Sequence, residues 1–162
     1  MIHPNKEIMG KAIEEAKVSS SLGQYALGAV IVDANGEVIA TEHTTTHATN
    51  DATAHAEVNV IRSACKKLDS RYLPGCWLYT TLEPCPMCAA AAIWAKMEGV
   101  VFGATKNDAV EFSKKLGKEK FTWRQIDMSA SEIVVKGDPK IKLVEKFMRE
   151  ECLKLFEFAN KE

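Results

Sequence analysis

Helix-type and strand-type patterns alternate along most of this 162-residue chain. Apolar residues spaced three and four apart, such as Ile8, Ala12 and Ala16, mark a first helix. Short runs rich in β-branched and aromatic residues, bounded by Gly, Pro, Asn or Asp, mark strands. The predicted elements are, in order, a helix over residues 5–21, strands over 26–32 and 37–42, a loop over 44–50, a helix capped by Thr53, a strand over 76–81, a helix beginning near Pro86, a strand over 100–104, a last strand over 132–136 and a long closing helix over 139–160.

This order of elements predicts an α/β fold, a three-layer α/β/α sandwich around one mixed five-stranded sheet. Two of the helices each join consecutive strands, which predicts right-handed crossovers and parallel strands at the centre of the sheet. Neither an internal repeat nor a low-complexity linker divides the sequence. A chain of this length can bury a substantial core, so we expect residues 1–162 to form a single domain.

Charge and hydropathy argue against several classes of protein. The net charge is -1, which gives no overall attraction to nucleic acid. No apolar run approaches the roughly 20 residues that span a bilayer, and the charged, amphipathic start differs from a signal peptide. The five cysteines are an odd number, which argues against a disulfide framework. We therefore expect a cytoplasmic protein without membrane contact.

Cys85 and Cys88 lie three residues apart where Pro86 favours the first turn of a helix. Both sulfur atoms then face the same side, and a helix N-terminus lowers the pKa of a thiol. His55 lies near the start of another predicted helix. Two thiolates and one imidazole suit Zn²⁺ and leave its fourth position open, which is typical of a catalytic site.

Two other uses of the cysteine pair remain open. A Cys-x-x-Cys pair alone is often a redox pair or half of a structural zinc site. A structural site needs a fourth ligand, for which Cys76, His43 and His47 are the candidates. Redox chemistry has no use for a His-x-Glu motif, so the full set of residues favours the catalytic interpretation.

His55 and Glu57 form a His-x-Glu pair, and residues 84–88 read Pro-Cys-Pro-Met-Cys. Together the two motifs resemble the signature of the cytidine deaminase-like superfamily of zinc-dependent deaminases. The resemblance implies zinc held by His55, Cys85 and Cys88, with Glu57 as the catalytic proton carrier. It also implies hydrolytic removal of an amino group from a nucleobase or nucleoside, with release of ammonia.

Within the superfamily, the segments 55–58, 61–68, 93–96 and 107–109 resemble the guanine deaminase branch. The segment 50–55 is also similar to tRNA adenosine deaminases, which usually carry Pro in place of Ala52. The guanine branch implies a free purine base or nucleoside as substrate, and a homodimer. Adenosine-to-inosine deamination in tRNA is the alternative. A third possibility, from a different class, is a catalytically silent zinc-binding module on the same fold.

Four residues are candidates for substrate binding. Leu27 precedes Gly28-Ala29, where guanine deaminases usually have an aromatic residue, and Thr44 takes the place of a substrate-binding Asn. A threonine hydroxyl cannot make the two-point contact of an amide. The backbone of Ala56 is expected to bind and recognise the substrate ring. Asp108 could contact a substrate amino group or cap the next helix.

Residues 114–124 interleave Lys and Arg with Phe121 and Trp123. Such a pattern can grip phosphates and stack bases. A solvated loop whose aromatic side chains pack on the core or on a dimer mate is the preferred interpretation, because the net charge gives no support to nucleic-acid binding. A nucleic acid is therefore a possible but less favoured partner.

Overall fold

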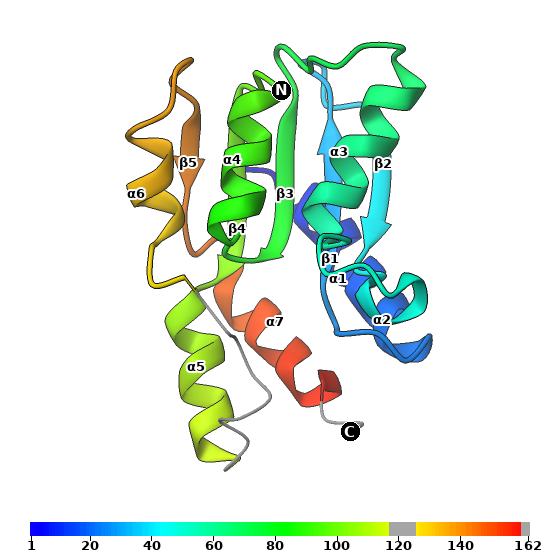
Figure 1. The fold of residues 1–162 in the computed structure, drawn as a ribbon, viewed down its shortest axis with the longest axis vertical. Coiled ribbons are helices and arrows are strands. Elements are labelled where there is room, and N and C mark those ends of the chain that lie inside the picture. Colours follow the sequence, from blue (N-terminus) through cyan, green and yellow to red (C-terminus); the bar gives the residue numbers. More distant parts are fainter. Residues whose placement is uncertain (117–125, 160–162) are drawn as a thin grey trace.

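The computed structural model describes residues 1–116 and 126–159 (Figure 1). Its strands are β1 (Gly28–Val32), β2 (Val38–His43), β3 (Trp77–Leu82), β4 (Gly99–Ala104) and β5 (Lys142–Val144). The helices of the described residues are α1 (Lys6–Ser21), α2 (Thr46–Thr49), α3 (Ala56–Lys67), α4 (Pro86–Trp94), α5 (Lys106–Lys115), α6 (Ala130–Val134) and α7 (Arg149–Leu153), followed by a 3₁₀ turn, η1 (Lys154–Ala159). Within these residues, no helix combines the length and the apolar character needed to cross a membrane.

The strands form one mixed sheet in the order β2-β1-β3-β4-β5. Strand β1 is antiparallel to both of its neighbours, whereas β3, β4 and β5 are parallel to one another. The five-stranded mixed sheet and its helices on both sides confirm the predicted three-layer α/β/α fold. The predicted parallel pairing is confirmed for β3 and β4, the strands that α4 joins. The strands that α3 joins, β2 and β3, are not neighbours, because β1 lies between them.

The two faces of the sheet carry separate halves of the core. Because side chains alternate across a strand, Tyr79 and Val101 point to one face while Leu78 and Val100 point to the other. The first face is covered by α1, α7 and η1, and the second by α3, α4 and α6. In Figure 1 the N-terminal ends of α3 and α4 lie side by side at one edge of the sheet. This edge carries the candidate site.

The C-terminal third differs from the sequence prediction. Residues 132–136, predicted to be a strand, fall in and after α6. The physical reason is a capping box, in which the Ser129 hydroxyl accepts from the Glu132 backbone and the Glu132 carboxylate accepts from the Ser129 N–H at 2.7 Å. The long helix predicted over 139–160 is replaced by β5, α7 and η1. Lys146 and Met148 have positive φ angles of 59° and 51°, which a continuous helix cannot contain.

Three smaller differences lie closer to the motifs. The segment predicted to be a loop over 44–50 contains the short helix α2. The predicted cap Thr53 instead donates its hydroxyl to Asp51 at 2.7 Å, and His55 is the N-cap residue of α3. Helix α5 is missing from the predicted order of elements, although Asp108 is a candidate helix cap, and Thr105 and Asp108 form a second capping box at its start.

Candidate metal centre

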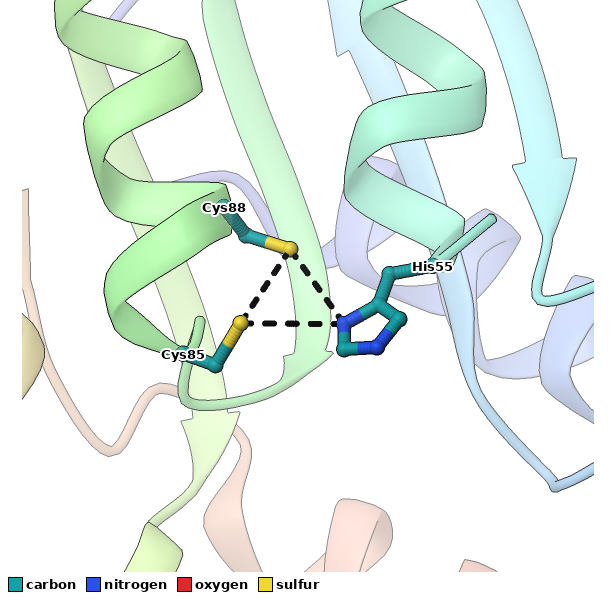
Figure 2. A group of neighbouring side chains, drawn as sticks. All are labelled: His55, Cys85 and Cys88. Carbon is teal, nitrogen blue, oxygen red and sulfur yellow. Dashed lines mark hydrogen bonds between the residues drawn. The ribbon is translucent and has the colours of Figure 1, made fainter. Parts of the chain in front are cut away.

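His55, Cys85 and Cys88 meet at the edge of the sheet where α3 and α4 begin (Figure 2). His55 is the N-cap residue of α3, Cys85 is the N-cap residue of α4, and Cys88 lies in the first turn of α4. Both N-cap residues have extended backbones, with φ and ψ of -68° and 153° at His55 and -65° and 168° at Cys85. Strand β3 ends at Leu82, three residues before Cys85, so the sheet fixes where α4 starts.

The spacing of the three donor atoms fits a tetrahedral zinc ion. The Cys85 and Cys88 sulfur atoms are 3.6 Å apart, and His55 Nδ1 lies 3.7 Å from Cys85 Sγ and 3.5 Å from Cys88 Sγ. Zinc bonds of about 2.3 Å to sulfur and about 2.0 Å to nitrogen at tetrahedral angles require separations of about 3.8 Å and about 3.5 Å. The donor atoms of the cluster are therefore positioned to bind a zinc ion without rearrangement, as predicted from the sequence.

The alternative fourth ligands lie elsewhere. Cys76 is buried in the second half of the core. His43 Nδ1 is 2.6 Å from a carboxylate oxygen of Glu15, and the His47 ring lies 4.9 Å from the ring of Tyr25. Among the described residues, the only group of three or more potential metal ligands is the His55, Cys85 and Cys88 cluster. Three protein ligands are the number expected at a catalytic zinc site.

The cluster already favours a thiolate at Cys85. A hydrogen bond with Cys88 lowers the pKa of Cys85 to about 4, and His55 adds to this effect. The same hydrogen bond, followed by burial, raises the pKa of Cys88. The pKa of His55 is raised, chiefly by its hydrogen bond with Cys85.

Glu57 is buried beside the cluster, with 6% of its surface exposed. Burial raises the pKa of its carboxyl group, and the Cys85 thiolate adds to the increase, while a hydrogen bond with Cys88 opposes it. In a regular helix, residues two apart point in nearly opposite directions. Because the backbone of His55 is extended and not helical, both side chains reach the same cluster.

Two of the predicted substrate-binding residues, Thr44 and Ala56, adjoin the segment of the ligand His55, and a third, Leu27, contacts Thr44. The Thr44 N–H donates to the Leu27 carbonyl at 3.4 Å, and the Thr44 hydroxyl donates to the Ala54 carbonyl at 3.3 Å. Thr44 is 1% exposed and Ala56 is fully buried, whereas Leu27 is half-buried between the two halves of the core. Their contact with a substrate stays a prediction.

Asp108 is engaged by other parts of the protein. Its two carboxylate oxygens accept from Arg149 at 2.9 Å and 2.6 Å, and one of them also accepts from the Thr105 N–H at 2.9 Å. The structure thus shows the capping contact directly, and a substrate contact remains a prediction. Of the basic segment 114–124, residues 117–124 lie outside the described residues.

Two residues near the cluster were not identified from the sequence. Asn59, one turn after His55, donates its side-chain amide to the His43 carbonyl at 2.9 Å, to Thr45 Oγ1 at 3.0 Å and to the Ala54 carbonyl at 3.3 Å. Glu83 accepts hydrogen bonds from two helix starts, as described below. A polar residue inside a helix, and an acidic one directly before Pro84-Cys85, were the available signals.

Comparison with known proteins agrees with this site. The family model described as the cytidine and deoxycytidylate deaminase zinc-binding region matches residues 3–104. A tRNA-specific adenosine deaminase of Bacillus subtilis is 49% identical over 96 residues, which cover 59% of this chain and 59% of the relative. A guanine deaminase of the same organism is 44% identical over 105 residues, covering 65% of each. The chain thus spans about three fifths of the length of the first of these relatives.

Solved structures give a similar result. One from a study of tRNA:A34 deaminases that edit the wobble position of transfer RNA has a TM-score of 0.74 and 31% identity, and covers 93% of this chain and 99% of that one. A guanine deaminase structure from Bacillus subtilis has a TM-score of 0.63 and 35% identity, covering 79% of this chain and 87% of that one. The family match extends over more than half of the sequence and includes all three ligands and Glu57. This chain therefore belongs to the cytidine and deoxycytidylate deaminase zinc-binding family.

Proposed function

We propose that this chain catalyses the hydrolytic deamination of a free purine base or nucleoside, with a guanine-type ring as the preferred substrate. The observation that carries the proposal is the buried Glu57 carboxyl group beside two cysteines and a histidine whose spacing fits zinc. When bound there, zinc would bring the pKa of a water molecule toward about 7 and so supply a nucleophile at neutral pH. The overall reaction exchanges a ring amino group for an oxo group and consumes one water molecule.

Glu57 is the proposed proton carrier. The carboxylate takes one proton from the attacking water and delivers it to the ring nitrogen. It then takes the remaining proton from the added hydroxyl group and delivers it to the amino group, so that the carbon–nitrogen bond breaks, ammonia leaves and the ring carbonyl forms. Burial raises the pKa of Glu57 above its ordinary value, and a carboxyl group with a raised pKa is a better proton donor after it has accepted a proton. Removal of one general acid–base group typically lowers a rate by about 10² to 10⁴-fold.

The backbone of Ala56, the Thr44 segment and Leu27 are the proposed contacts of the substrate ring. Thr44 and Leu27 are linked by a backbone hydrogen bond, and Thr44 also contacts the carbonyl that precedes His55. A ring held against these groups would lie next to Glu57. Homodimer formation, expected from the resemblance to guanine deaminases, stays a prediction.

Deamination of adenosine in tRNA is the second candidate. Its support is the 49% identity to a tRNA-specific adenosine deaminase and the 31% identity to a structure from a study of tRNA:A34 deaminases. The net charge of -1 favours the small substrate instead, because phosphate backbones are bound largely through positive charge.

Ammonia release from the zinc-loaded protein tests both candidates. The substrates are guanine, guanosine, adenine, adenosine, cytosine, cytidine and a tRNA anticodon stem-loop, each with the wild type and with Glu57→Gln at equal zinc content. We expect release from a guanine-type base or nucleoside and a loss of at least about 10²-fold in the variant. Release only from the stem-loop would transfer the assignment to tRNA. Silence on every substrate, or full turnover by Glu57→Gln, would refute the proposed chemistry.

A further inference from the structure

Glu83 joins the turn that carries Cys85 to the starts of two helices. One carboxylate oxygen of Glu83 accepts from the backbone N–H of Lys106, the first residue of α5, at 2.8 Å. The other oxygen accepts from the backbone N–H of Ala130, the first residue of α6, at 2.9 Å. The backbone N–H of Glu83 in turn donates to the Ala104 carbonyl at the end of β4, also at 2.8 Å. We infer that Glu83 is a positioning residue for the zinc ligand Cys85.

The hydrogen bonds leave the Glu83 carboxylate little freedom. The first N–H groups of a helix have no partner within the helix, so each of these amides needs an outside acceptor. Hydrogen bonds to an ionised carboxylate are stronger than those between neutral groups. Because the two oxygens serve different helices, a rotation of the carboxylate breaks at least one bond. The plane of the carboxylate is thereby fixed relative to β4, α5 and α6.

This restraint extends to Cys85 through a short and stiff connection. Pro84 is the one residue between Glu83 and Cys85, and its ring fixes its φ angle. Cys85 has an extended backbone and is followed by a second proline, Pro86. With Glu83 held in place and two prolines around Cys85, the sulfur atom has few alternative positions. The 3.6 Å and 3.7 Å separations of Cys85 Sγ from the other two ligands depend on that placement.

The structure offers a matched control for this inference. Glu132 is also a glutamate whose carboxylate accepts from a backbone N–H at the start of α6, that of Ser129, but it is exposed, and this hydrogen bond lies within the α6 cap. Glu132→Gln and Glu83→Gln remove the same charge and weaken the same kind of helix-start bond. Only Glu83→Gln should change the zinc site, because only Glu83 restrains a ligand.

The experiment measures metal binding and not turnover, so it is independent of the substrate. Zinc affinity is determined by competition with a chelator, and the absorption spectrum of the Co²⁺-loaded protein reports the geometry of the thiolate ligands. For Glu83→Gln we expect zinc affinity to fall about tenfold or more, in the range found when groups outside the ligand set are removed, with an altered cobalt spectrum. Glu132→Gln should keep both properties of the wild type.

A second variant separates position from charge. Glu83→Asp keeps the negative charge but is one methylene shorter, so it cannot reach both amides, and we expect it to weaken zinc binding as well. It also provides the decisive measurement if Glu83→Gln does not fold. Zinc affinity within twofold of the wild type and an unchanged cobalt spectrum in the folded variants would overturn the inference, whatever their thermal stability.

Discussion

Replacing Asp108 by Asn distinguishes a fold-stabilising role of this carboxylate from a contact with the substrate. The Arg149 guanidinium lowers the pKa of Asp108 to about 2, and the hydrogen bonds at Thr105 add to the effect. Asp108 holds two segments together, because it caps α5 while its ion pair fixes the start of α7. The neutral amide of Asn keeps the size of the side chain but loses the charge that Arg149 recognises.

The pKa gives the size of the effect. A decrease from 3.8 to about 2 corresponds to about 2.5 kcal/mol of folding free energy, since each tenfold change in an equilibrium constant is about 1.4 kcal/mol. The Asp108 side chain is 13% exposed but that of Arg149 is 39% exposed, so solvent screening reduces the stabilisation to about 1 to 2 kcal/mol. In a chain of this length, that range corresponds to a melting temperature lower by about 2 to 8 °C.

The pH dependence has a definite sign. Because the pKa of Asp108 is lower in the folded protein than in the unfolded chain, its stabilisation is complete above about pH 4. It is lost as the pH falls from about 4 through about 2. The difference between wild type and Asp108→Asn should therefore be constant from pH 7 to pH 5 and shrink below pH 4.

Urea unfolding of the metal-free protein across this pH range measures the effect, with Arg149→Gln as the partner variant. If the ion pair acts as described, the double variant loses little more stability than Asp108→Asn alone. Additive losses, or a loss below about 0.5 kcal/mol for Asp108→Asn, would refute the reasoning. A higher KM in Asp108→Asn that Arg149→Gln does not share would instead support a substrate contact.

Three further predictions concern packing, metal and the Asn59 contacts. A Cβ at Gly28 would lie 2.2 Å from the Ala12 carbonyl oxygen, so Gly28→Ala should destabilise the protein by about 3 kcal/mol in urea unfolding. Gly10→Ala in α1, where a Cβ meets nothing within 4 Å, should instead stabilise it by about 0.5 to 1 kcal/mol. Zinc removal by a chelator should lower the melting temperature by on the order of 10 °C, and added zinc should restore it, because a ligand that binds only the native state stabilises it. Asn59→Ala should lower the free energy of unfolding in urea by about 2 kcal/mol, because it removes several hydrogen bonds. The control Ser63→Ala removes one hydrogen bond between α3 and β2 and should lower it by about 1 kcal/mol. Equal losses in the two variants would contradict the role of Asn59.

The ligands and most of the first hundred residues could be predicted because their signals are local. The helix predicted over residues 5–21 agrees with α1 to within one residue. Pro86 marks the start of α4, and the separation of Cys85 and Cys88 places both sulfur atoms on the first turn. The meeting of His55 with these cysteines follows from the predicted sheet, because α3 and α4 begin at the same edge.

The C-terminal third could not be predicted by the same reasoning. Residues 139–160 have a helical composition, but β5 gains its hydrogen bonds from β4, a contact across more than forty residues of sequence. The breaks at Lys146 and Met148 require positive φ angles that neither residue type signals. The two capping boxes, by contrast, can be recognised in the sequence as the motifs Thr105-x-x-Asp108 and Ser129-x-x-Glu132. Glu83 differs again, because its partners become visible only when β3, α5 and α6 are assembled.

The positions of His55 and Cys85 imply a trade-off between stability and function. Three other helices of the described residues are capped by the side chains of Asn5, Thr105 and Ser129, but the N-cap residues of α3 and α4 make no side-chain cap. A capping side chain typically stabilises a helix by about 1 kcal/mol, so α3 and α4 each lack this contribution to stability. Selection for thermostability alone would favour Asp or Ser at both positions and would erase the metal centre. A metal ion that binds only the folded chain compensates for the missing caps, which makes the working protein more robust than its metal-free form.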